Sequence, residues 1–192
     1  MDDKHLVEKY LNEDDEEALN ELVKRYLSGV YNFIYRFVGV QSEAEDLAQE
    51  TFIKLWKNLK KFRKDENFKT WLFTIARNTA FDFMRRKKPL LFSDFENAEG
   101  DNILLDTIAT AELKPNEIFE QLETEKKVDD LMGELSGSSK EVVLLHHYEE
   151  MTFDQIGKVL NKPLNTVKSR YRRALMEMKK IVDSQNYAPK RK

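Results

Sequence analysis

Residues 152–180, TFDQIGKVLNKPLNTVKSRYRRALMEMKK, have the pattern of two short helices joined by a tight turn. Thr152 is a candidate N-cap, and Gln155 three residues later completes a capping box. A helix cannot continue unbroken through Pro163, so we expect a turn there and a second helix capped by Asn165. Along that second helix, apolar residues recur at the helical spacing of a buried stripe: Val167, Tyr171, Ala174, Met178 and Ile181.

The remaining faces of the second expected helix are strongly basic. They carry Lys168, Ser169, Arg170, Arg172, Arg173, Lys179 and Lys180. A helix-turn-helix places its second helix in the major groove of DNA, where Lys and Arg donate to base edges and hold phosphates. The pattern therefore predicts a DNA-binding helix-turn-helix. The alternative is an ordinary helical hairpin with a solvated basic face.

The composition favours an all-α fold. Of the 192 residues, 41% are hydrophobic and 35% are charged, and the six Gly and four Pro leave few points for turns. No Cys is present, which excludes disulfides, thiolate zinc sites and cysteine nucleophiles. We find neither a signal-peptide pattern nor an apolar run of about 18 residues, so we expect a cytoplasmic protein without direct membrane insertion.

Charge is unevenly distributed along the chain, although the net charge is only −3. Residues 54–88 carry +9 and residues 161–192 carry +8, whereas residues 89–134 between them carry −10. Because the Debye length at physiological salt is about 8 Å, separate blocks of charge act as separate fields. We infer two nucleic-acid contact surfaces with an acidic segment between them.

The first long helix is expected to begin after a cap at Asp14 or Asp15 and to end at Gly39. Its apolar stripe contains a candidate break at Ser28-Gly29, because Gly inside a helix is unfavourable by about 1 kcal/mol relative to Ala. The apolar stripe resumes after this point, so both parts are expected to pack on one core.

The next expected helix, SEAEDLAQETFIKLWKNLKKF (residues 42–62), has a candidate cap at Ser42. Its apolar face consists of Ala44, Leu47, Ala48, Thr51, Phe52 and Leu55. Asp46, Gln49 and Glu50 lie away from the middle of that face. They are typical of a solvated surface, and they also suit an acidic patch that docks on a basic partner helix.

A loop over residues 60–67 precedes a further helix, FKTWLFTIARNTAFDFMRRKK (residues 68–88), whose expected core face is Leu72, Ile75, Ala76, Thr79 and Phe83. A second face mixes amide, aromatic and cationic groups: Thr74, Arg77, Asn78, Phe81, Arg85 and Lys88. This mixture suits single-stranded DNA, whose bases stack on aromatic rings while its phosphates meet cations. In the alternative interpretation Phe81 belongs to the core and the cations are merely solvated. Trp71 is interpreted as a core residue rather than a stacking platform.

Helical periodicity fades over residues 89–115, which we interpret as a flexible acidic linker. A helix is expected over residues 117–135, followed by a break at residues 136–139 and a short helix over residues 141–150. The expected organisation is therefore two small helical domains and their connections: residues 1–88, the linker 89–115, residues 116–183 with the helix-turn-helix, and a basic tail 184–192.

With these motifs in order, the sequence resembles an extracytoplasmic-function (ECF) sigma factor, the smallest type of the bacterial sigma-70 family of transcription initiation factors. The resemblance covers residues 16–88 and 116–182, and it rests on AEDLAQETFIKLW, FKTWLFTIARNTAFDFMRRKK and PLNTVKSRYRRAL. The family usually has Gly where this chain has Asn165, which leaves a good helix cap in place.

The resemblance implies three contact surfaces. One docks on the clamp helices of the RNA polymerase β′ subunit and consists of Asp46, Gln49 and Glu50. The second binds and melts the promoter −10 element and consists of Lys61, Arg63, Phe68, Arg77, Asn78, Arg85 and Arg86. The third faces the −35 duplex and consists of Asn165, Thr166, Lys168, Ser169, Arg172 and Arg173. Extruding a base costs a few kcal/mol unless a pocket offsets it, so melting requires such a surface.

The resemblance also implies the partners: core RNA polymerase, promoter DNA in duplex and single-stranded form, and an anti-sigma factor. No cofactor, metal site or catalytic residue is expected. A competing hypothesis is a stand-alone helix-turn-helix regulator, which would bind DNA without contacting polymerase. A helical enzyme is disfavoured because the adjacent His146 and His147 would point about 100° apart on a helix. The chain also lacks HExxH, a phosphate-binding Gly loop and a nucleophile elbow.

Overall fold

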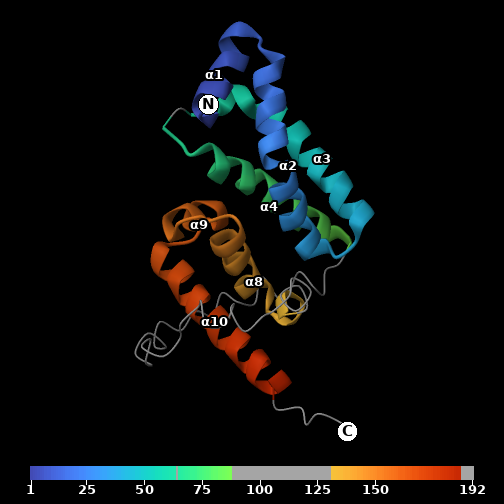
Figure 1. The fold of residues 1–192 in the computed structure, drawn as a ribbon, viewed down its shortest axis with the longest axis vertical. Helices are drawn as coiled ribbons and strands as arrows, with labels where there is room; N and C mark the ends of the chain where they lie inside the picture. The colour runs from blue at the N-terminus through green and yellow to red at the C-terminus, as the bar shows by residue number, and fades with distance from the viewer. Residues whose placement is uncertain (64, 88–130, 187–192) are drawn as a thin grey trace. The chain divides into compact units, whose positions relative to one another are not determined.

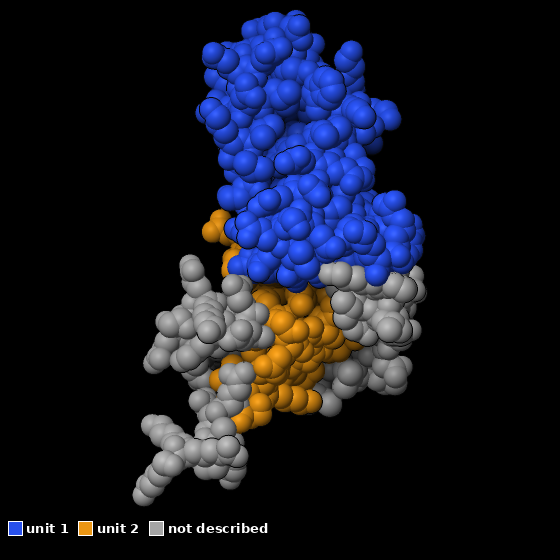
Figure 2. Space-filling view, turned by 90° about the vertical axis from the view of Figure 1, so that its right-hand side faces the viewer, with its two compact units in different colours: residues 1–89, 158–161 blue, residues 90–157, 162–192 orange. Residues whose placement is uncertain are grey.

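The structure, a computed structural model, describes residues 1–63, 65–87 and 131–186, and the side chains as far as residue 184. The expected linker, Lys88 and the end of the basic tail lie outside the described residues. The chain divides into two compact units, residues 1–89 with 158–161 and residues 90–157 with 162–192 (Figure 2).

The described part of the N-terminal unit consists of helices and short connections (Figure 1). Helix α2 packs against α1, α3 and α4, and α3 also packs against α4. The elements are α1 (Asp3–Glu13), α2 (Glu16–Val38), α3 (Gln41–Asn58), the short 3-10 helix η1 (Leu59–Lys61) and α4 (Phe68–Lys87).

Helix α2 begins and ends where its sequence predicts, and it is continuous. The Asp15 side chain accepts hydrogen bonds from two backbone N–H groups of the first turn, and Gly39 ends the helix with φ of 74°. The expected break at Ser28-Gly29 is wrong, because α2 continues through both residues. Buried Leu22 and Val30 on either side anchor the helix to the core, which outweighs the low helix propensity of Gly.

Helix α3 begins one residue before the predicted cap. Its N-cap residue is Val40, without a side-chain hydrogen bond, so the prediction of a Ser42 cap is wrong. Ser42 lies exposed in the first turn, where Gln41 donates to the Glu45 carboxylate at 2.8 Å. The predicted apolar face is buried apart from the half-buried Phe52.

Aromatic side chains join α2 to α4. Phe33 meets Phe73 edge-to-face with ring centroids 5.5 Å apart, and Phe37 meets Phe81 in the same way at 5.8 Å. Such pairs contribute about 0.5–1.5 kcal/mol each beyond area burial. Phe81 is therefore a core residue, as the alternative interpretation had it.

The described residues 131–186 end in a helix-turn-helix, which confirms the prediction from residues 152–180. The non-helical break before α8 covers Leu135 and Ser136, so the expected break over residues 136–139 is too long. The elements, shown in Figure 1, are α8 (Gly137–Val143), a π-helical segment η4 (Leu144–Tyr148), α9 (Phe153–Leu160) and α10 (Leu164–Asn186).

The turn between α9 and α10 follows from local chemistry. Thr152 and Gln155 form the predicted capping box, with reciprocal backbone-to-side-chain bonds of 2.8 and 3.3 Å. The Lys162 N–H bonds to the Gly157 carbonyl at 2.9 Å, and a Cβ on Gly157 would lie 2.9 Å from the Lys162 carbonyl oxygen, so only Gly fits there. Helix α10 begins at Leu164, so the predicted cap at Asn165 is wrong.

Candidate polymerase and nucleic-acid interfaces

One exposed face of α3 carries the residues expected to dock on polymerase. Asp46 and Gln49 are exposed, and Glu50 is half-buried. The face continues with two apolar side chains, Ile53 and Trp56, which are 50% and 53% exposed. Neither residue was predicted from the sequence, although both follow Gln49 at four- and seven-residue spacing on the helix.

Neighbouring side chains hold this α3 face in place. Trp56 Nε1 donates to the Tyr10 hydroxyl of α1 at 2.6 Å, which fixes the indole on the surface. Lys54 Nζ lies 2.7 Å from the Glu50 carboxylate one turn earlier. The face therefore combines an acidic end with an apolar end, a composition suited to a partner helix with basic and apolar side chains.

The loop before α4 contains exposed cations around a buried aromatic cluster. Lys61 and Arg63 are exposed, whereas Phe68 is 2% exposed. The Phe68 ring packs against Phe62 at 5.6 Å and against Tyr26 at 5.7 Å between centroids. Core packing covers the Phe68 ring, so this structure does not present Phe68 as a direct contact for the −10 element.

Arg63 forms an ion pair within its own loop. Its guanidinium lies 2.9 Å from the Asp65 carboxylate. The hydrogen bond from Arg63 lowers the pKa of Asp65 below its usual value, and the backbone adds to this effect. The loop then enters α4 through Asn67, whose side-chain oxygen accepts from the Thr70 N–H at 2.9 Å.

Helix α4 carries an amide and a group of cations at its surface. Asn78, Arg85 and Arg86 are exposed, and Arg77 is half-buried. The Arg77 guanidinium lies over the Phe81 ring at 4.1 Å from the centroid, so the aromatic ring supports the cation instead of presenting its face. Arg85 also bonds to Asp82 at 2.9 Å.

The second helix of the helix-turn-helix presents most of its predicted DNA-facing residues. Asn165 and Lys168 are exposed, and the other four are half-buried: Thr166, Ser169, Arg172 and Arg173. Arg170, which the sequence places among the basic side chains of this helix, is instead only 3% exposed. Its guanidinium lies 4.0 Å from the carboxylate of Glu141, a residue of α8 that is 1% exposed.

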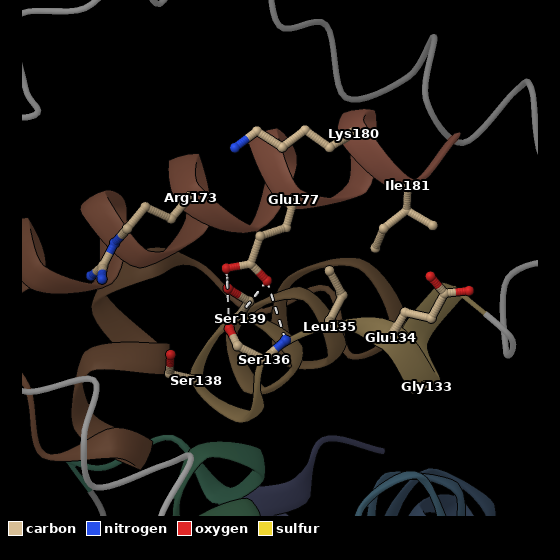
Figure 3. Close-up of a pocket in the computed structure, with 10 residues that line it drawn as sticks. All are labelled: Gly133, Glu134, Leu135, Ser136, Ser138, Ser139, Arg173, Glu177, Lys180 and Ile181. Carbon is tan, nitrogen blue, oxygen red and sulfur yellow. Dashed lines mark hydrogen bonds between the residues drawn. The ribbon is translucent and has the colours of Figure 1, made fainter. Parts of the chain in front are cut away.

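Two further polar contacts tie α10 to the segment before the helix-turn-helix. Figure 3 shows the Glu177 carboxylate pointing toward the start of α8, where it accepts from the Ser136 N–H at 3.2 Å and from the Ser139 hydroxyl at 3.0 Å. The Tyr171 hydroxyl lies 2.8 Å from His147 Nε2. Burial lowers the pKa of His147 to about 4, helped by the adjacent His146, and burial raises the pKa of Tyr171 to about 12.

The two adjacent histidines pack as aromatic rings. The His146 ring stacks on Phe153 with centroids 4.6 Å apart, and its Nδ1–H donates to the Met151 carbonyl at 2.8 Å. Within the described ranges, no three His, Cys, Asp or Glu side chains are grouped to hold a metal ion. Across the same ranges, no helix is long and apolar enough to cross a membrane.

Comparisons with known families identify both units. The sigma-70 region 2 family matches residues 22–89, and the sigma-70 region 4 family matches residues 125–178. The chain belongs to the sigma-70 family, as an ECF-type sigma factor. This membership confirms the resemblance, and a stand-alone regulator is not favoured because region 2 occupies the N-terminal unit. Sigma factors are transcription factors, not enzymes.

Two sigma factors are similar in sequence to this chain along nearly the whole length of both proteins. The ECF RNA polymerase sigma factor SigW of Bacillus subtilis is 31% identical over 90% of this chain and 92% of its own. The RNA polymerase sigma-H factor of Pseudomonas aeruginosa is 34% identical over 90% and 89%.

Solved structures share the fold at lower identity. CnrH in complex with the cytosolic domain of CnrY matches with a TM-score of 0.68 at 22% identity, covering 95% of this chain and 97% of CnrH. RpoE of Bartonella quintana, in complex with the anti-sigma factor NepR, matches with a TM-score of 0.64 at 22% identity, covering 85% and 96%.

Proposed function

We propose that this ECF sigma factor binds core RNA polymerase through α3, opens the −10 element with α4, and recognises −35 duplex with α10. The observation that carries this proposal lies in the N-terminal unit: α3 exposes Asp46 and Gln49, while the adjacent α4 exposes Asn78 and Arg85. An acidic docking face and a basic nucleic-acid face on neighbouring helices are what a factor needs if it holds polymerase while opening DNA.

The −10 surface would combine one base reader with several phosphate contacts. The amide of Asn78 can donate to and accept from a base edge. Four exposed cations and the half-buried Arg77 would hold the backbone of the displaced strand; the exposed ones are Lys61, Arg63, Arg85 and Arg86. Phe68 would act indirectly, by supporting the loop that carries Lys61 and Arg63.

The −35 surface would use the start of α10. Asn165 and Lys168 are exposed in its first turns, the part of a recognition helix that contacts base edges. Thr166, Ser169, Arg172 and Arg173 would complete the contact with bases and phosphates. Residues 1–88 and 116–183 would thus form two promoter-binding domains, joined by the acidic segment 89–115.

Regulation by an anti-sigma factor in the cytoplasm is the third part of the proposal. CnrH and RpoE, which share the fold, were both solved in complex with a second protein, and in the RpoE complex that protein is an anti-sigma factor. A comparable partner would hide one or both DNA-binding surfaces of this chain. Co-purification from the native host, followed by inhibition of transcription by the captured protein, tests this part.

Run-off transcription with purified core polymerase tests the main proposal. The wild-type chain is expected to yield promoter-specific transcripts from genomic fragments, and the triple variant Asp46→Ala, Gln49→Ala, Glu50→Ala is expected to lose both transcripts and polymerase pull-down. A matched control removes the same chemistry from another exposed part of the unit: Asn12→Ala, Glu13→Ala, Glu16→Ala. Equal loss in both triple variants, or pull-down that survives in the first, contradicts the docking assignment.

A further inference from the structure

A pair of buried, oppositely charged side chains connects α8 to the recognition helix. Arg170 of α10 and Glu141 of α8 have side chains only 4% and 1% exposed, and Arg170 Nη1 lies 4.0 Å from Glu141 Oε2. Desolvating two charges is expensive, and removing one partner of such a pair leaves an uncompensated buried charge. The pair is thus unlike the surrounding cations of α10, which reach the surface.

The position of Arg170 within α10 gives the pair a geometric consequence. Lys168, two residues earlier, is exposed, and Arg172, two residues later, is half-buried. Successive residues of a helix are about 100° apart around its axis. Holding Arg170 against Glu141 therefore fixes the rotation of α10, and with it which side chains point away from the unit.

Contacts at two other points fix α10 along its length. Glu177 accepts from Ser136 and Ser139 at the start of α8, as Figure 3 shows, and Tyr171 contacts His147 in the π-helical segment. In the first contact the donors to Glu177 are neutral serines, and the second contact joins two uncharged rings. Glu141 and Arg170 supply the contact in which both partners are charged and buried.

We infer that Glu141 and Arg170 are a positioning pair for −35 recognition: Arg170 does not touch DNA, but the pair sets the rotation of α10 that presents Lys168, Ser169 and Arg172 to the base edges. This inference rests on the proposed −35 function of α10. It assigns a role in promoter selectivity to two residues, one of which lies outside the helix-turn-helix.

The test measures selectivity and salt dependence separately. The full chain is titrated by fluorescence anisotropy against two duplexes: one selected by the wild-type chain from a random library, and a scrambled duplex of equal composition. The main variant, Glu141→Met with Arg170→Met, removes one charge of each sign and so preserves the net charge. Lys168→Met is the matched control for loss of an exposed cation. Circular dichroism establishes folding.

The double variant is expected to lose about tenfold or more in the ratio of selected to scrambled affinity. Its slope of log K against log salt on the scrambled duplex is expected to stay unchanged. Lys168→Met should reduce that slope by about 0.9, because on a scrambled duplex this exposed cation has no matching base edge and neutralises one phosphate instead. If the double variant does not fold, Glu141→Asp replaces it, because this variant keeps both charges and shortens only the acidic side chain. It should lower the ratio of selected to scrambled affinity about threefold and leave the salt slope unchanged.

Two results overturn the inference while leaving −35 binding intact. If the double variant folds and keeps the wild-type ratio of selected to scrambled affinity, the pair has only a structural role. If only Glu141→Asp folds, a wild-type ratio in that variant has the same meaning. A slope reduced as in Lys168→Met would make Arg170 a phosphate contact. Failure of the wild-type chain to select any duplex has a different signature, and it overturns the −35 function together with the inference.

Discussion

Lys54 Nζ donates a hydrogen bond to Thr79 Oγ1 at 3.0 Å and so ties α3 to α4. Thr79 is 2% exposed and stands next to Asn78, the proposed base reader. The same ammonium group lies 2.7 Å from Glu50, a residue of the proposed polymerase-docking face. One side chain therefore links the helix proposed to hold polymerase to the helix proposed to open DNA.

Replacing Lys54 by Met is expected to lower the free energy of unfolding by about 1 kcal/mol. The variant removes a hydrogen bond to a buried hydroxyl and a half-exposed ion pair, each of which contributes about 1 kcal/mol or less. Urea denaturation measures the change. Lys57→Met, which removes an exposed lysine from the same helix, should change stability by less than about 0.5 kcal/mol. Equal losses in the two variants would mean that the bond to Thr79 adds nothing.

Phe68→Ala is expected to destabilise the chain by about 3–5 kcal/mol, because it empties a fully buried site in the Phe62–Phe68 cluster. Thermal or urea unfolding of the full chain gives the value. Phe83→Ala, at a half-buried position of the same helix, should cost clearly less. A Phe68→Ala variant of wild-type stability that has lost single-stranded DNA binding would restore Phe68 as a direct contact.

The sequence predicted features whose causes are local. The Thr152–Gln155 capping box, the Asp15 cap and the Gly39 helix end each depend on residues within one turn, and each is present. The acidic residues of α3 are also exposed as the helical spacing requires. The sequence could not locate Arg170, because its burial depends on Glu141 of another helix.

Two further residues differ from what the sequence indicates, one because of a distant partner and one because of where a helix starts. Phe68 has a residue type that suits base stacking, but Tyr26 of α2 covers it. Ser42 has a good capping side chain, yet α3 starts earlier and leaves it exposed. For Phe68, packing against another helix decides the direction of the side chain, and residue spacing within one helix does not encode that packing.

Trp56 should report polymerase docking by its fluorescence. The chain contains two Trp, so a Trp71→Phe variant leaves the exposed Trp56 as the sole indole. If the α3 face docks on the β′ clamp helices, adding a Trp-free clamp-helix fragment should shift the emission of Trp56 to shorter wavelength, because the indole leaves water. The Asp46→Ala, Gln49→Ala, Glu50→Ala background is the control and should show no shift. An unchanged spectrum despite binding would place the interface elsewhere.

Stability should fall as pH decreases from about 6.5 toward 4, in part because of His147. Burial holds the pKa of His147 at about 4 in the folded chain, below the usual 6.5, so the unfolded chain binds more protons in this range. The contribution is present in full above pH 6.5 and is lost toward pH 4. Since His147 is only partly buried, we expect about 1–2 kcal/mol after allowing for solvent screening.

Urea denaturation at pH 7.5, 6 and 5 tests this contribution. In His147→Gln the decrease in stability over this range should be smaller than in the wild-type chain, because the titrating group is gone. His5→Gln removes an exposed histidine of α1 and should leave the wild-type pH dependence in place. A steeper decrease in His147→Gln would show that the ring gains a proton more easily in the folded chain than in the unfolded one.

Glu177→Gln is expected to lower the free energy of unfolding by about 1–2 kcal/mol, because the carboxylate caps the start of α8 from another helix. Its two oxygens accept from the Ser136 N–H and from the hydroxyls of Ser136 and Ser139, and an amide would turn an N–H₂ toward one of those donors.

Urea denaturation of Glu177→Gln gives the loss of stability, and hydrogen exchange at the Ser136 and Ser139 amides should show faster opening there. Asp183→Asn removes the same charge from an exposed position of α10, and it should change neither the free energy of unfolding nor the exchange at Ser136 and Ser139. If both variants lost equal stability without faster exchange, the effect of Glu177 would be that of charge on α10, and the start of α8 would not depend on its cap.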